Sequence, residues 1–209
     1  LMINKSLFKK TAAVAIGLSL SSNVMAQSVM RVASWLPPTH PQNAVVLPTW
    51  GKWIEEATEG RVKMEIEYGM GHPKTMFDLV EDGVVDASWT VHGYVPGRFK
   101  LTESVELPNL QADAEAASVA LWRINNKYYK PANEHEGLIV AGLFTHGPGQ
   151  IHLADPITTL ADLKGKKIRL GGAIQWKVGE RLQVTAVGAP APKVYELMQQ
   201  GVVDGVFIP

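Results

Sequence analysis

One arginine in an apolar segment is the residue of this 209-residue sequence best suited to hold a charged ligand. Arg169 lies in the segment 167–170, which is predicted to form a strand covered on both faces. A permanent charge in such a place needs a partner. The planar guanidinium can bind a carboxylate through two parallel hydrogen bonds. The alternative is that Arg169 follows Lys166 and Lys167 onto an exposed sheet edge, where water solvates it.

Aromatic and polar side chains gather at the ends of the expected strands, which is where open parallel sheets bind ligands. Glycines in the same segments allow the backbone to approach a ligand closely. We therefore predict a binding site that combines Arg169 with nine further residues. These are Trp35, His40, Trp89, His92, Tyr94, Phe144, Gln150, His152 and Gly172.

The histidines raise the question of a metal site or a catalytic base. They are His40, His72, His92, His135, His146 and His152. They show neither an i, i+4 pair nor the HExxH spacing of a zinc site, so we expect no metal. The sequence has no GxSxG elbow, and Gly147-Pro148-Gly149 lacks the continuation of a dinucleotide-binding loop, so we expect no cofactor and no catalytic residue. The alternative is an enzyme that uses His92, His146 or His152 as a general base.

A repeated segment indicates how the elements that position these residues are organised. Residues 77–89 (FDLVEDGVVDASW) are echoed by residues 195–207 (YELMQQGVVDGVF). In both copies a short helix is expected to stop at glycine, which suits a left-handed C-terminal cap, and Val-Val-Asp then begins a strand. In the first copy we expect this strand to run on towards Tyr94.

The segments before the two copies match as well. A strand, a helix and a strand are predicted before each copy, at 29–35, 41–58 and 61–68 and at 167–170, 174–182 and 184–191. Each half is therefore βαβαβ, the pattern of a doubly wound parallel sheet, and the fold class is α/β with two lobes.

A helix over residues 112–129 and an apolar strand over 138–144 are expected to connect the halves. We place the lobes at 27–137, including the connecting helix, and at 138–209, with a cleft between them.

Residues 1–26 have the layout of a cleavable secretory signal peptide, which predicts export to the periplasm. Three lysines precede an apolar run over residues 11–20, which has about half the length that a membrane-spanning helix needs. Removal of these lysines changes 20 basic and 20 acidic side chains to 17 and 20, so no cationic surface for nucleic acid is expected. The chain has no cysteine, which excludes disulfides, thiolate metal sites and a cysteine nucleophile.

Four segments of the chain are distinctive: 55–62 (EEATEGRV), 78–86, 160–169 (LADLKGKKIR) and 194–205. They resemble the solute-binding subunits of tripartite ATP-independent periplasmic (TRAP) transporters, the DctP family. The resemblance implies a periplasmic binding protein fold of type II that captures a small organic acid anion. It also implies delivery of this anion to the small and large permease subunits in the membrane; we expect the protein to be a monomer. In the family, the arginine of the third segment clamps the ligand carboxylate, and this arginine falls on Arg169.

The sequence departs from the family pattern at several points. Members usually follow the arginine with Val-Pro-Gly, where this chain has Leu170-Gly171-Gly172. The second arginine of sialic-acid binders is missing from 147–152, and Ile208 replaces their asparagine, so sialic acid is not expected. Aromatic residues near the cleft favour a carboxylate on an apolar or aromatic body, while a C4-dicarboxylate or a 2-oxo acid stays open. Members also continue beyond the second Val-Asp-Gly strand, so we expect the C-terminal part of the second lobe to be missing.

Overall fold

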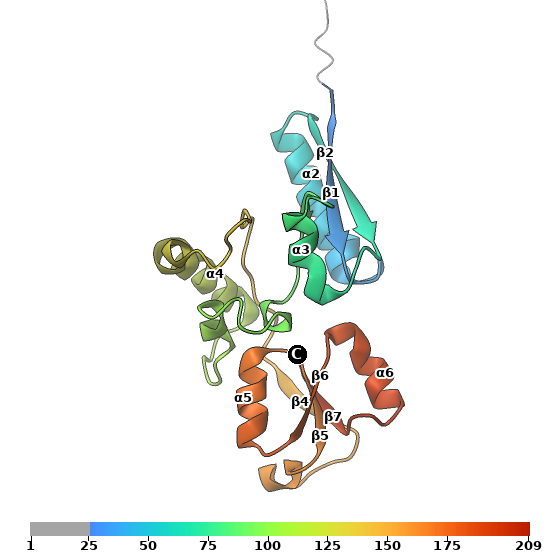
Figure 1. Ribbon diagram of the computed structural model, residues 1–209, viewed down its shortest axis with the longest axis vertical. Helices are drawn as coiled ribbons and strands as arrows, with labels where there is room; N and C mark the ends of the chain where they lie inside the picture. The colour runs from blue at the N-terminus through green and yellow to red at the C-terminus, as the bar shows by residue number, and fades with distance from the viewer. Residues whose placement is uncertain (1–25) are drawn as a thin grey trace, which may run out of the picture.

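The computed structural model describes residues 26–209, which form two α/β lobes (Figure 1). The signal-peptide prediction therefore falls outside the described residues, apart from its last position. The first lobe contains a sheet of strand order β2-β1-β3 in which both pairs are parallel. Its elements are β1 (Ser28–Ser34), the helical turn η1 (Gln42–Val46), α2 (Leu47–Ala57), β2 (Val62–Tyr68), the turn η2 (Pro73–Thr75), α3 (Met76–Glu81) and β3 (Ala87–Ser88).

The second lobe contains a four-stranded sheet of order β4-β7-β5-β6. Strand β4 is antiparallel to β7, and the other pairs are parallel. Its elements are β4 (Gln150–Leu153), the turn η7 (Leu160–Leu163), β5 (Lys167–Leu170), α5 (Ala173–Arg181), β6 (Thr185–Gly188), the turn η8 (Ala191–Lys193), α6 (Val194–Gln199) and β7 (Gly205–Ile208). Figure 1 shows α5 and α6 on opposite faces of this sheet, so the sheet is doubly wound.

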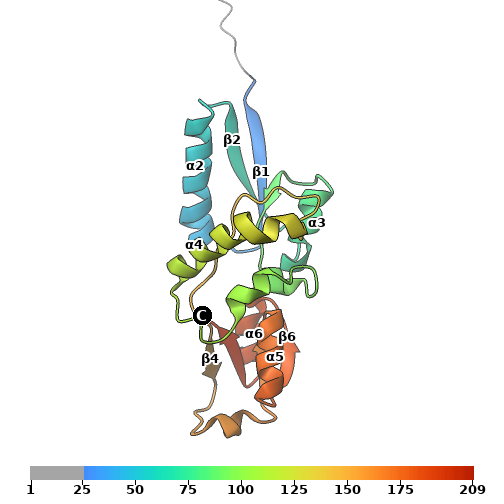
Figure 2. The ribbon, with the colours of Figure 1, turned by 90° about the vertical axis from the view of Figure 1, so that its left-hand side faces the viewer.

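A connecting segment lies between the two sheets in the sequence. Figures 1 and 2 show its main helix, α4, beside the first lobe and outside both sheets. The elements of the segment are η3 (His92–Tyr94), η4 (Thr102–Glu106), α4 (Ala114–Ile124), η5 (Asn125–Tyr129) and η6 (Lys130–Ala132). Among residues 26–209, no helix is both long enough and apolar enough to span a bilayer.

Each lobe has its own small core. In the first lobe, Ala33 of β1 packs with Val85, just before β3. In the second lobe, Ile168 and Leu170 of β5 are buried and pack with Val178 of α5. Ile168 and Leu170 are apolar because β5 is a parallel strand in the middle of the sheet, and such a strand is covered on both faces.

The repeated segments adopt the same backbone conformation in both lobes. Helices α3 and α6 are each followed by a glycine in the left-handed region, with φ of 68° at Gly83 and 65° at Gly201. The residue after each glycine donates its N–H to the carbonyl five positions back, at 2.9 and 3.0 Å. This is the Schellman motif, which satisfies the last carbonyls of a helix and turns the chain into the next strand.

The aspartate of each repeat fastens this turn to the central strand of its lobe. Asp86 donates its N–H to the Arg31 carbonyl at 3.0 Å, and its carboxylate accepts the Arg31 N–H at 2.7 Å. Asp204 makes the same two bonds to Lys167, both at 2.7 Å. Each aspartate thus satisfies both backbone groups of one residue of β1 or β5, which explains why Val-Val-Asp occurs twice.

The predicted fold class is confirmed: each half is βαβαβ, and the sequence places most elements within a few residues of their observed bounds. The strand predicted at 138–144 is wrong. No strand lies beside this segment within the described residues to complete a hydrogen-bonded ladder, and Ile139 is 98% exposed.

The strand expected to continue towards Tyr94 is also wrong, because β3 ends at Ser88. The indole N–H of Trp35 donates to the Trp89 carbonyl at 3.0 Å. This carbonyl is therefore not available for the backbone hydrogen bonds that would extend β3. The chain then turns into η3.

Replacing Asp204 or Asp86 by alanine removes the carboxylate that accepts a strand N–H. We expect each change to lower the free energy of unfolding by about 1 kcal/mol, the usual net value of one hydrogen bond. Urea denaturation measures this, and Asp82→Ala is the matched control, because Asp82 is exposed and its side chain makes no hydrogen bond within residues 26–209. Equal midpoints for all three variants would contradict the role of the two aspartates.

Candidate functional site

Arg169 is held at the carboxyl ends of the strands of the second lobe. Its side chain lies almost wholly inside the protein, with 3% exposure. Its Nε donates to the carbonyl of Ala189, just after β6, at 2.8 Å. Its Nη1 donates to the carbonyl of Phe207, in β7, at 2.9 Å. The guanidinium therefore joins three neighbouring strands, and the alternative of a solvated arginine on an exposed edge is wrong.

The charge of Arg169 has no opposite charge beside it. Within the described residues, none of the ion pairs involves Arg169. Burial lowers the pKa of the guanidinium, and the nearby Tyr94 side chain raises it in part. Two backbone carbonyls accept from Nε and Nη1, and the Tyr94 side chain is a further hydrogen-bond partner of the guanidinium. The remaining N–H groups and the unbalanced charge can bind an anion.

Two consecutive glycines shape the space around the guanidinium. A Cβ atom on Gly171 would stand 2.5 Å from Nη2 of Arg169, so any side chain there would displace the guanidinium. A Cβ on Gly93, in η3, would stand 2.6 Å from the Cα atom of Gly172. Two backbones therefore touch where the connecting segment meets the start of α5. Gly171 stands where the family usually has the proline of Val-Pro-Gly, and the position of the guanidinium in this chain requires a residue without a Cβ atom there.

Tyr94 comes from the connecting segment and reaches the same place. It is 6% exposed, and its hydroxyl oxygen accepts the N–H of Ala191 at 2.9 Å. The residue that it binds is two positions from Ala189, the partner of Arg169 Nε. Tyr94 and Arg169 thus approach one short backbone segment, 189–191, from different parts of the chain.

A row of aromatic rings extends from Tyr94 into the first lobe. Tyr94 lies edge-on to Trp35 with ring centroids 5.9 Å apart, Trp35 lies 4.9 Å from Trp89, and Trp89 lies 6.4 Å from Phe144. The Trp89 indole N–H donates to the hydroxyl of Ser34 at 3.3 Å, and the Trp35 N–H is already bonded to the Trp89 carbonyl. Both indole N–H groups are therefore used within the protein.

The remaining predicted site residues lie in different surroundings. His40 is exposed, and its Nδ1 accepts the backbone N–H of Gln42 at 3.2 Å, as in a local turn. Gln150 and His152 are exposed on β4, opposite Ile208 and Val206 of β7. Phe144, in contrast with buried Tyr94, is 57% exposed.

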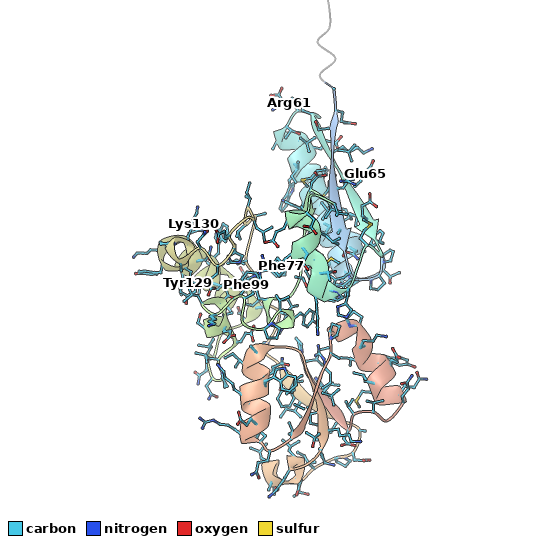
Figure 3. All side chains as sticks on the ribbon, in the orientation of Figure 1. Arg61, Glu65, Phe77, Phe99, Tyr129 and Lys130 are labelled. Carbon is cyan, nitrogen blue, oxygen red and sulfur yellow. The ribbon has the colours of Figure 1, made fainter. Side chains whose placement is uncertain are left out.

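His92 belongs to a separate cluster on the connecting segment. Its Nδ1 lies 2.8 Å from the Thr102 hydroxyl, its ring stacks on Phe99 at 4.0 Å, and its Nε2 lies 3.4 Å from Nε2 of His135. Figure 3 labels Phe99 and the neighbouring Phe77, whose ring centroids are 4.8 Å apart. Within the described residues, the His92 ring makes its contacts inside this cluster. Beyond the presence of the two histidines and the phenylalanines, no sequence pattern predicts this cluster.

The cluster could supply two metal ligands at most. Among residues 26–209, no three His, Cys, Asp or Glu side chains lie close enough together to hold a metal ion. The pKa of His92 is lowered from 6.5 to about 4, first by burial and then by His135 and Arg98. The pKa of His135 is also lowered, chiefly by burial. Both rings are therefore neutral at pH 7.

A second contact between the connecting segment and α5 was not predicted. Glu106, at the end of η4, accepts the N–H of Ile174, and a Cβ on Gly172 would stand 2.9 Å from its Oε2. Burial and the nearby Glu103 raise the pKa of Glu106, whereas the hydrogen bond lowers it. Glu103 pairs with Lys177 of α5 at 3.7 Å. A carboxylate at the positive end of α5 holds the connecting segment against the second lobe.

With this geometry in place, comparison with known proteins identifies the family. The family described as "Bacterial extracellular solute-binding protein, family 7" (DctP) matches residues 32–209. The chain belongs to the DctP family. The resemblance predicted from the repeat and from the segment around Arg169 is thereby confirmed.

Solved structures of TRAP periplasmic solute-binding proteins resemble this DctP chain closely. One from Bordetella bronchiseptica, with bound (R)- and (S)-mandelate, is 40% identical with a TM-score of 0.82, over 87% of this chain and 58% of that one. One from a marine metagenome, described as specific for aromatic acid ligands, was solved with 3-hydroxybenzoate. It is 37% identical with a TM-score of 0.82, over 88% and 58% of the two chains.

A third structure, from Rhodoferax ferrireducens, holds copurified benzoate. It is 31% identical with a TM-score of 0.81, over 88% of this chain and 57% of that one. Among curated proteins, "Outer membrane transporter protein TsaT" of Comamonas testosteroni is 30% identical over 93% of this chain and 58% of its own length. The chain thus spans a little under three fifths of the length of these relatives.

The low pKa of His92 predicts that acid destabilises the folded DctP chain. Below pH 6.5 His92 binds a proton in the unfolded chain, whereas in the folded chain it stays neutral down to about pH 4. The folded state therefore loses stability as the pH decreases through this window. The loss approaches about 3 kcal/mol at 1.36 kcal/mol per pKa unit.

Urea unfolding at several pH values measures this loss. His92→Gln should have a smaller slope of stability against pH than the parent, because it removes the group whose pKa is lowered. Identical slopes for parent and His92→Gln would show that His92 titrates normally.

Proposed function

We propose that this DctP-family chain is a periplasmic solute-binding protein of a TRAP transporter that captures an aromatic carboxylate. The observation that carries the proposal is the buried guanidinium of Arg169, which has two backbone partners and no opposite charge among residues 26–209. A buried charge of this kind is stabilised by an anion that brings acceptors of its own. A carboxylate does so, because it accepts two parallel N–H bonds from one guanidinium.

The aromatic rings beside Arg169 support an apolar body on the ligand. The indole N–H of Trp35 donates to the Trp89 carbonyl, and that of Trp89 donates to the Ser34 hydroxyl. The remaining surface of both rings is therefore apolar. A ring placed against them gains burial and aromatic contact. The hydroxyl groups of a sugar acid would lose water there without gaining partners, which is a large cost. The rings thus favour an aromatic acid over a polyhydroxylated acid of similar size.

The related structures support the same class of ligand. Three relatives that share 31–40% identity with this chain hold mandelate, 3-hydroxybenzoate or benzoate. Each of these molecules is a single carboxylate attached directly, or through one carbon, to a ring. This favours an aromatic monocarboxylate over the C4-dicarboxylate and the 2-oxo acid that the sequence left open.

The transport role includes delivery of the acid to the small and large permease subunits of the membrane. The family and the structural relatives are solute-binding proteins, which supports binding without chemical change of the ligand. The alternative is an enzyme with a histidine base. His92 is engaged with Thr102, Phe99 and His135, which does not favour that alternative. Mass spectrometry of benzoate after incubation with the protein distinguishes the two, since an enzyme returns a changed molecule.

Loss of the guanidinium fork should abolish tight binding. Arg169→Lys keeps the charge but cannot make two parallel bonds, and we expect the dissociation constant for benzoate to rise at least ~100-fold, equivalent to about 3 kcal/mol. Isothermal titration calorimetry measures this, with Arg181→Lys, an exposed arginine on α5, as the matched control. An affinity within a few-fold of the parent would remove Arg169 from the proposal.

The class of ligand is tested by thermal stability. A ligand present at ~100 times its dissociation constant adds about 2.7 kcal/mol of stability. Benzoate and mandelate should therefore raise the melting temperature of the protein, whereas gluconate, a polyhydroxylated acid, should not. Stabilisation by gluconate but not by benzoate would contradict the assignment of the aromatic rings.

A further inference from the structure

The hydroxyl group of Tyr94 is buried with one half of its hydrogen-bonding capacity unused. Its oxygen accepts the N–H of Ala191 at 2.9 Å. A phenol also has one O–H donor, and no acceptor within residues 26–209 receives it. Buried donors without an acceptor are uncommon in folded proteins and call for an explanation.

The guanidinium of Arg169 lies at the same place. Arg169 uses Nε and Nη1 on the carbonyls of Ala189 and Phe207, and the Tyr94 side chain is a third hydrogen-bond partner. Since a guanidinium has five N–H groups, it can still donate to a further acceptor. The Tyr94 hydroxyl and the Arg169 guanidinium are brought together because both bind the backbone segment 189–191. Tyr94 comes from the connecting segment and Arg169 from β5 of the second lobe.

The two donors need a group that only accepts hydrogen bonds. A carboxylate has two oxygens and no proton, so it can take the N–H groups of the guanidinium and the O–H of the phenol at the same time. An amide cannot replace it without loss, because its NH2 group would face a donor.

We propose that Tyr94 is a second donor to the ligand carboxylate, so that the carboxylate is held by Arg169 from the second lobe and by Tyr94 from the connecting segment. The inference rests on the proposed function, since it requires that the ligand is a carboxylate bound at Arg169. It adds a role for Tyr94: the anion itself bonds the two parts of the chain together. Tyr94 is thus a specificity-determining residue that selects an ionised carboxylate over an amide.

Tyr94→Phe tests this role. It keeps the ring against Trp35 and removes the hydroxyl, so benzoate affinity should fall about 10- to 100-fold, as for the loss of one hydrogen bond to a charged group. Calorimetry measures the affinity, and Tyr195→Phe, on the exposed face of α6, is the matched control with no expected change. An affinity for Tyr94→Phe within threefold of the parent would overturn the proposal.

Spectroscopy separates a direct bond from a merely structural role. Benzoate labelled with ¹³C in its carboxyl group should give a different bound resonance in Tyr94→Phe than in the parent, because the carboxylate has lost a donor. Weaker binding with an unchanged resonance would mean that Tyr94 acts only through Ala191, which also overturns the proposal.

A measurement on the parent protein covers the case in which Tyr94→Phe does not fold. With tyrosine labelled at Cζ, benzoate should shift one buried tyrosine resonance, and it should not do so in Arg169→Lys. If no tyrosine resonance moves although benzoate binds, Tyr94 is not a donor. If parent and Arg169→Lys bind benzoate equally, the proposed function itself fails, and the role of Tyr94 fails with it.

Discussion

The central physical constraint in the second lobe is the almost complete burial of one guanidinium, that of Arg169. The charge of Arg169 is tolerated because two backbone carbonyls, from the ends of β6 and β7, are within hydrogen-bond distance of it. Those carbonyls are available only because the strands end together at one edge of a parallel sheet. The order β4-β7-β5-β6 puts β5 between the two strands that supply them. The strand order of this lobe therefore determines which carbonyls can accept from the buried guanidinium.

The two lobes share a framework and differ in what they place on it. Asp86 and Asp204 bind the equivalent residues Arg31 and Lys167, so the equivalent positions two residues further on are Ala33 and Arg169. In the first lobe this position is a buried alanine in the core. In the second lobe it is Arg169, with its guanidinium bonded to two neighbouring strands. The same backbone position thus serves packing in one lobe and carries the proposed anion-binding side chain in the other.

Much of this organisation could be predicted from the sequence because it is local or repeated. Glycine after a short helix and Val-Val-Asp after the glycine specify the turn wherever they occur, and two copies predict two equivalent sheets. Arg169 could be singled out because a charge is unusual in a buried strand. The residues that depend on distant contacts could not be found in this way. The carbonyls of Ala189 and Phe207 are invisible in a sequence, and so is the cluster that takes His92 away from the aromatic row. The apolar segment 138–144 has the composition of a strand, but composition does not supply a neighbouring strand.

The contact between Gly93 and Gly172 restricts which residues can stand at position 93. A Cβ atom on Gly93 would stand 2.6 Å from the Cα atom of Gly172. Backbone atoms cannot move aside as the end of a flexible side chain can, so a larger residue there would push the connecting segment away from the start of α5. The same movement would carry Tyr94, the next residue, away from the Ala191 N–H that it accepts.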